Sequence, residues 1–351
     1  MNPADTLHGA AYWLPIAWFA VIGFGVLMYV LLDGFVLGLG ILAPFAESED
    51  ELDHMMNTAA PIWDGNETWL VLGGAGLLAA FPKAYATVLS TLYLPVLAML
   101  LALIFRGVAF EFRFKGQGRA KRAWGMAFSL GSIVAAFTQG LILGTLVQGI
   151  PPEAASVRGS ALLWFNPFSM LTGAALLTGY ALLGCGWLIL KTEGGLHRMA
   201  RTLARPLVLM VLLFMLLVSS WLPQLDERVM LRWFDGWNLL YLSPVPVLTL
   251  LAAVNLWRDA ALPPHGPRPH DARPLLWTLA LFVLGFVGLL LGMWPFIVPP
   301  GLTLWDAASP PSSQGFLLAG LVVLLPLILG YTAWSYSVFR GKVAADAGYH
   351  H

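Results

Sequence analysis

The sequence predicts an all-α protein of about nine transmembrane helices, and two observations indicate this class. Of the 351 residues, 58% are hydrophobic and only 11% are charged, whereas a soluble domain has about 25% charged residues. Apolar runs recur along the whole chain, and about 20 apolar residues suffice to span the hydrocarbon of a bilayer. We therefore expect an integral membrane protein in which residues 1–351 form one transmembrane domain.

The predicted spans follow one another closely. They cover residues 12–32, 57–80, 84–105, 124–147, 164–190, 206–222, 239–257, 275–298 and 315–339. Pro82 lies in the short join FPK and is expected to end one helix and help to start the next. Pro244 and Pro246 interrupt the seventh span, and a proline inside a helix kinks it. The segments between the spans are too short to bury a core of their own.

The distribution of Lys and Arg predicts the orientation of the chain in the membrane. The loops after spans 1, 3, 5 and 7, with the C-terminal tail, contain 15 of the 19 basic residues. The carboxyl terminus is therefore expected in the cytoplasm and the amino terminus outside, which requires an odd number of spans. The acidic stretch ESEDELDH, between the first two spans, gives this rule no support. No basic residue precedes the first apolar run, so we expect this run to be retained rather than cleaved as a signal peptide.

Several kinds of site are disfavoured by the sequence. Basic and acidic residues number 19 each, and no long basic run occurs, so no nucleic-acid partner is expected. The single cysteine, Cys185, lies in an apolar run and is expected to be a small buried side chain. All seven histidines fall at the ends of the predicted helices or in loops. We therefore expect the chain to ligate no haem, which usually needs His, Met or Cys inside a bundle.

Three acids lie in or beside the predicted spans. An ionised carboxylate at the bilayer centre costs about 2.5–3.5 kcal/mol, so acids kept there usually face protein or water and have a task. Asp33 ends the first apolar run, while Asp64 and Glu67 share one face of the second span, because residues three apart are helical neighbours. We interpret the three as a proton path that is entered from the cytoplasmic side. In the structural alternative, Asp64 caps a helix or pairs with a base such as Arg106.

The residues around these acids form the motif WDGNETW. Trp63 and Trp69 flank the acids, and their rings suit an interfacial aromatic belt, a helix contact or a wall that orders water. Spacing does not distinguish these roles. We expect Trp63, Asn66 and Trp69 to belong to the motif that meets a partner, although Asn66 could also serve only for packing.

Six stretches together resemble subunit II of the cytochrome bd quinol oxidases. They are DGFVLGLGILAP (33–44), PIWDGNETWLVLGGAGLLAAFPKAYA (61–86), FRGVAFEFRF (105–114), WFNPF (164–168), WPFIVPPGLTLWDAAS (294–309) and YTAWSY (331–336). The resemblance runs in order along nearly the whole chain. The stretches GVLMYVLLDGF and LIFRGVAFEFR are closer to the cyanide-insensitive branch of the family.

The resemblance implies a fold, a location and partners. The fold would be two four-helix bundles plus one peripheral helix, in the bacterial inner membrane. The family oxidises a quinol and reduces oxygen to water, with two b-type haems and one d-type haem, or a b-type variant, on subunit I. Subunit II would ligate none of them, would support subunit I and would provide a proton path from the cytoplasm. A structural quinone in this subunit and a small single-span subunit occur in some members.

The resemblance also implies roles for single residues. Asp64 falls on the acid of the second helix for which a proton-channel role is proposed, and Asp33 falls on the first acid of a DGFD-type motif. Val36 replaces the second acid of that motif. Glu67 stands where other members have Gln, and we hypothesise that it is a replacement proton site.

Two other functions remain open from the sequence. Acids within spans and broken helices also mark proton-coupled secondary transporters, which would work without a haem-bearing partner. A structural assembly subunit with inert acids is the third possibility.

Overall fold

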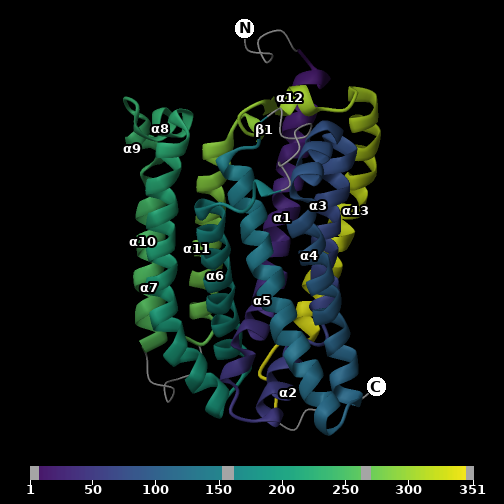
Figure 1. The fold of residues 1–351 in the computed structure, drawn as a ribbon, viewed down its shortest axis with the longest axis vertical. Coiled ribbons are helices and arrows are strands. Elements are labelled where there is room, and N and C mark those ends of the chain that lie inside the picture. Colours follow the sequence, from purple (N-terminus) through teal and green to yellow (C-terminus); the bar gives the residue numbers. More distant parts are fainter. Residues whose placement is uncertain (1–7, 152–161, 262–269, 345–351) are drawn as a thin grey trace.

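The computed structural model describes residues 8–151, 162–261 and 270–344. Long helices lie side by side, and α1 begins at the end of the bundle opposite to the one where α13 ends (Figure 1). Eight helices of the described residues are long and apolar enough to cross a membrane. They are α1 (Ala10–Leu42), α4 (Pro82–Lys115), α5 (Gly118–Gln148), α6 (Pro167–Lys191), α7 (Gly194–Leu225), α10 (Pro244–Ala261), α11 (Arg273–Met293) and α13 (Pro311–Val338). The predicted all-α membrane class is confirmed.

The remaining predicted span is α3 (Trp63–Ala80), which packs against α1 and α4 among the long helices (Figure 1). Helix α3 is not counted among the eight apolar helices, because the polar residues of its first turns lower its mean hydropathy. The prediction that this span begins at residue 57 is wrong, because the acidic stretch forms a separate helix, α2 (Glu49–Asn57). The Ser48 side chain caps α2 by accepting a hydrogen bond from the backbone N–H of Glu51.

The long helices form two groups of four with one helix outside them. In the first group, α1, α3, α4 and α5 contact one another, and in the second, α6 contacts α7 and α11, which in turn contact α10. The groups meet where α6 packs against α1 and α5. The last helix, α13, contacts only α1 and α3 closely and lies at the edge of the first group (Figure 1).

Prolines interrupt two of the predicted spans. The seventh span is divided directly before Pro244, because α9 (Asn238–Leu242) ends there and α10 begins with Pro244. The predicted interruption is therefore confirmed, and both prolines lie in the first turn of α10, where a missing N–H breaks no helical hydrogen bond. A second distortion lies in α4, in which Leu92 has non-helical angles (φ −111°, ψ 20°). Pro95 explains this distortion, because it cannot donate to the carbonyl one turn earlier.

Short elements lie between the long helices. A 3₁₀ turn follows α1, and α8 and α9 separate α7 from α10. The proline-rich segment after α11 folds as an antiparallel hairpin followed by one helical turn. These elements are η2 (Ala43–Phe45), α8 (Glu227–Phe234), α9 (Asn238–Leu242), β1 (Phe296–Val298), β2 (Leu302–Thr303) and α12 (Leu304–Ala307).

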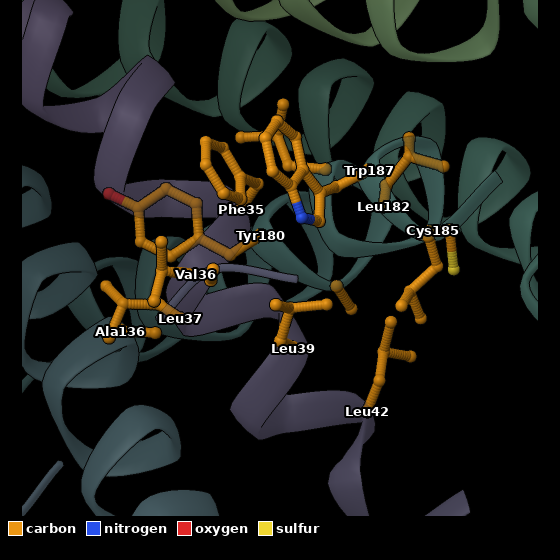
Figure 2. Close-up of a cluster of buried hydrophobic side chains, with 14 of the residues drawn as sticks. Phe35, Val36, Leu37, Leu39, Leu42, Ala136, Tyr180, Leu182, Cys185 and Trp187 are labelled. Atoms are coloured by element: carbon orange, nitrogen blue, oxygen red, sulfur yellow. The ribbon is translucent and has the colours of Figure 1, made fainter. Parts of the chain in front are cut away.

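The largest buried cluster lies where α1 meets α6 (Figure 2). Phe35 of α1 stacks on Trp187 of α6, with ring centroids 4.0 Å apart. Val36, which replaces the second acid of the motif, has 0% exposure within this cluster. A carboxylate there would be surrounded by apolar side chains. Cys185 is buried in the same cluster, as predicted (Figure 2).

Candidate functional site

Arg106 of α4 joins two of the predicted acids. Its Nη2 atom lies 2.8 Å from Oδ2 of Asp33 on α1 and 2.7 Å from Oε1 of Glu67 on α3. The side chains of Arg106 and Asp33 have 0% exposure, whereas that of Glu67 has 30%. Nε and Nη1 of Arg106 are buried and have no hydrogen-bond partner among the described residues. The guanidinium thus links three helices and has further donors to offer.

Aromatic side chains fix this arginine in place. The guanidinium carbon of Arg106 lies 5.7 Å from the ring centroid of Trp63, within the range of a cation–π interaction. Trp63 in turn stacks on Phe110 of α4, with centroids 5.0 Å apart and ring planes 5° from parallel. Trp63 is therefore part of the wall of the site.

The other two residues of the predicted motif face the interior. Asn66 has 1% exposure. Its amide donates to the carbonyl of Leu32, 2.9 Å away, and its Oδ1 accepts from the hydroxyl of Tyr336 on α13, 3.0 Å away. Trp69 also has 1% exposure and packs edge-on against Phe24. Asn66 and Trp69 therefore bind α3 to α1 and α13 within the chain rather than offering an outer surface.

Asp64 is not part of the buried ion pairs. It lies in the first turn of α3 and is exposed, and the residue at the N-cap is Ile62, with no side-chain cap. The structural alternative, in which Asp64 caps a helix or pairs with Arg106, is not what the structure shows, because Arg106 binds Asp33 and Glu67 instead. Asp64 and Glu67 nevertheless lie within one helical turn, with Asp64 on the outside and Glu67 between the surface and the core.

A second line of polar side chains reaches the site from α5 and α6. Gln139 Nε2 donates to the hydroxyl of Tyr29, 2.7 Å away, and the hydroxyl of Tyr180 donates to Gln139 Oε1, 2.8 Å away. Tyr29 lies one turn before Asp33 on the same face of α1, and both are buried. Our sequence analysis missed these residues. The available signal was Gln139, since an amide inside an apolar span needs hydrogen-bond partners there.

A separate charged cluster lies where α11 begins. Asp271 accepts hydrogen bonds from Lys342 Nζ at 2.8 Å and from Arg201 Nη2 at 3.0 Å. Burial alone would raise the pKa of Asp271, but the hydrogen bond and charge of Lys342, with His197 and Arg201, lower the pKa below its ordinary value. The cluster holds the segment after α13 against α6 and α7, and Val343 N donates to the Lys191 carbonyl.

The two buried histidines of the described residues are bound within the chain. The ring nitrogens of His197 lie 3.1 Å from the Ile189 carbonyl oxygen and 2.8 Å from Nε of Arg201, and Nε2 of His54 lies 2.9 Å from the Val343 carbonyl oxygen. Both histidines lie near helix ends.

Comparison with known proteins agrees with this fold. The family model of cytochrome bd terminal oxidase subunit II matches residues 14–339. Cytochrome bd-I ubiquinol oxidase subunit 2 of Escherichia coli K12 is 28% identical, over 95% of this chain and 96% of the relative. Cytochrome bd ubiquinol oxidase subunit 2 of Bacillus subtilis 168 is also 28% identical, over 93% of this chain and 96% of the relative. In the structure of bd oxidase from Geobacillus thermodenitrificans, one chain has the same fold, with a TM-score of 0.72 and 19% identity. The match covers 93% of this chain and 98% of that chain.

The apolar helices and these relatives together define a multi-pass protein of the bacterial inner membrane. The chain belongs to the family of cytochrome bd terminal oxidase subunit II. Its relatives are subunits of an oxidoreductase complex. The predicted resemblance is confirmed, and these relatives give no support to a secondary transporter.

Proposed function

We propose that this chain is the subunit without haem of a quinol-oxidising, oxygen-reducing complex and that it brings protons from the cytoplasm to the oxygen-reducing centre. The relatives are ubiquinol oxidase subunits by name, and reduction of oxygen to water consumes protons as well as electrons. The haems, two b-type and one d-type or a b-type variant, would belong to subunit I. The observation that supports the proton path best is the bridge from Asp33 through Arg106 to Glu67.

Charge balance supports proton exchange at this bridge. One guanidinium faces two carboxylates, so the cluster has a net negative charge unless one carboxyl group holds a proton. A net charge in a low-dielectric interior is costly, so a proton is favoured on one of the two acids. Glu67 is the partly exposed acid and receives one hydrogen bond from Arg106, whereas Asp33 is wholly buried and receives two. Glu67 is therefore the group that we expect to exchange protons.

Asp64 supplies the outer step of the proposed path. Its exposed carboxylate lies within one turn of Glu67 on α3. A carboxylate facing lipid hydrocarbon is costly, so the surface around Asp64 is expected to be covered by protein or water. Thr68 and Val71 continue the exposed face of α3, and α13 beside it is almost wholly exposed in the isolated chain. We propose that the haem-bearing subunit covers this surface, formed by α3 and α13.

The orientation follows from the basic residues. The C-terminal end of α4, the start of α5 and the end of α13 lie together at the end of the bundle that holds α2 (Figure 1). Most Lys and Arg residues belong to loops of this end. We propose that it is cytoplasmic, which places the buried bridge within reach of cytoplasmic protons.

The remaining partners are proposed from the family alone. They are quinol and oxygen as substrates of the complex, membrane lipid around it, a small single-span subunit, and a structural quinone in this chain. Membership of the cyanide-insensitive branch stays a prediction.

The experiment compares assembled complexes in sealed vesicles. Glu67→Gln and Asp64→Asn remove one acid each, and we expect each to lower oxygen consumption, or the membrane charging that accompanies it, by at least about tenfold. Asp235→Asn is the control, because Asp235 is an exposed acid outside the path. Haem content and subunit yield report assembly. Wild-type turnover and charging in both fully assembled variants would refute the path.

A further inference from the structure

The polar line from α6 to Asp33 runs through the contact between α1, α5 and α6. Its three members are uncharged: Tyr180, Gln139 and Tyr29. The Tyr29 and Tyr180 side chains are almost wholly buried, with 3% and 0% exposure. Uncharged polar groups at this depth are costly unless they are hydrogen-bonded, and here each is bonded to the next. We call Tyr180, Gln139 and Tyr29 the polar arm.

The polar arm has a direction. A side-chain amide has an acceptor at one end and donors at the other. Gln139 accepts from Tyr180 and donates to Tyr29. Because the Tyr29 oxygen receives the amide proton, its own O–H remains available to donate, and Asp33 is the anion four residues further along the same face of α1. The donors of Tyr180 and Gln139 thus both point along the polar arm toward the part of α1 that holds Asp33.

The polar arm cannot itself conduct protons. A carboxamide neither releases nor takes up protons near neutral pH, so it interrupts any relay between the two phenols. At the far end, Tyr180 is wholly buried and stacks on Phe282, with centroids 5.9 Å apart. The polar arm therefore ends inside the bundle rather than at water.

We propose that Gln139 is a positioning residue that acts through Tyr29. It keeps Asp33 ionised as the permanent partner of Arg106. Of the two buried acids, Glu67 alone then exchanges protons. This inference rests on the proposed proton path and assigns different tasks to its two buried acids. Asp33 is bound by Arg106, and in this proposal the hydroxyl of Tyr29, one turn earlier on α1, donates to it from a second side. Glu67 is held from one side and is partly exposed.

Other groups facing Asp33 leave room for this role. The ionisable groups that interact with it come from its own helix and from four neighbours; they are Tyr29 of α1, Glu67 of α3, Arg106 of α4, Tyr180 of α6 and Tyr336 of α13. Helix α5 contributes the amide of Gln139. Arg106 is the one cation of this set, so the phenol donor is the second stabilising contact of the anion.

The test measures the pH dependence of oxygen consumption in the purified complex. Tyr29→Phe removes the donor, and Gln139→Glu offers an acceptor that turns the Tyr29 hydroxyl away from Asp33. In both variants we expect the fall of turnover on the acid side to move to higher pH by about one unit, which corresponds to a tenfold change in proton binding. Thr138→Val is the matched control on α5, because the Thr138 hydroxyl bonds only to carbonyls of its own helix; its profile should equal that of the wild type.

Two outcomes separate the polar arm from the proton path. If Glu67→Gln is impaired while Tyr29→Phe and Gln139→Glu keep the wild-type pH profile, the polar arm is refuted and the path stands. If Glu67→Gln and Asp64→Asn both have wild-type turnover and charging, the path is refuted and the polar arm with it. Should Gln139→Glu not assemble, Tyr29→Phe decides, since it removes a single oxygen atom.

Discussion

The guanidinium of Arg106 lies 2.8 Å from the carboxylate of Asp33, although 73 residues separate them in the sequence. Neither side chain is exposed. A buried ion pair costs desolvation energy to form, but removing one partner leaves an uncompensated charge, which costs more. The pair therefore fixes α4 against α1 and brings the start of α3, with Glu67, to the same guanidinium.

Removal of the arginine should destabilise the chain strongly. Arg106→Gln leaves Asp33 and Glu67 without a cation, and we expect a loss of about 3–5 kcal/mol. Thermal unfolding and the yield of assembled complex would measure this loss of stability relative to the wild type. The double variant Asp33→Asn/Arg106→Gln should recover part of the loss, because the wholly buried acid is then no longer left as an unpaired charge. An Arg106→Gln variant as stable as the wild type would contradict this prediction.

The contact between α13 and α3 depends on one hydroxyl. Tyr336→Phe leaves Oδ1 of Asn66 without its donor, and we expect a loss of about 1 kcal/mol in the free energy of unfolding. Thermal unfolding of the complex measures it, and hydrogen exchange should rise in α13. Tyr241→Phe, at a site with 73% exposure, is the matched control. Equal destabilisation by both variants would show that the hydrogen bond contributes nothing.

Close packing of α1 on α6 requires glycine at two positions. A Cβ atom on Gly38 would lie 2.0 Å from the Tyr180 carbonyl oxygen and 2.7 Å from the Gly184 nitrogen. Gly38→Ala must therefore separate the helices, with an expected cost of about 1–3 kcal/mol. Gly292→Ala is the control, since a Cβ there meets nothing within 4 Å, and it should be neutral or slightly stabilising. The unfolding temperatures of the two variants test this prediction, and equal temperatures would contradict it.

The Asp271 cluster should weaken in acid. The pKa of Asp271 is lower in the folded chain than its ordinary value, so its contribution to stability is present above the unfolded value of about 3.9. It is lost as the pH falls through the folded value. The difference in unfolding temperature between wild type and Asp271→Asn should therefore be largest near neutral pH and shrink below about pH 4. A difference that does not change with pH would contradict this.

Much of the fold could be predicted because apolar length alone identifies membrane helices. The errors lie where tertiary contacts override composition. Helix α1 continues to Leu42, past the predicted end at residue 32, because Arg106 neutralises Asp33 inside it. The start of α3 was misplaced because the residues before it form a turn.

The site was only half visible in the sequence. Asp33 and Glu67 were expected, since acids in apolar runs are rare and their spacing reports neighbours on one helix. The polar arm and the bridge join different helices, and Gln139 meets Tyr29 across 110 residues of sequence. Spacing contains no information about such contacts. For the same reason Arg106 was named only as a possible partner of Asp64.

Helix α3 ends at Ala80 and α4 begins at Pro82, so a single residue, Phe81, separates the polar helix from an apolar one. Helix α3 is not among the helices apolar enough to cross a membrane, whereas α4 is, so we expect α3 to insert poorly by itself. We expect the apolar α4 to bring it into the bilayer as a helical hairpin. Lengthening this join should therefore impair insertion before it affects any property of the finished enzyme.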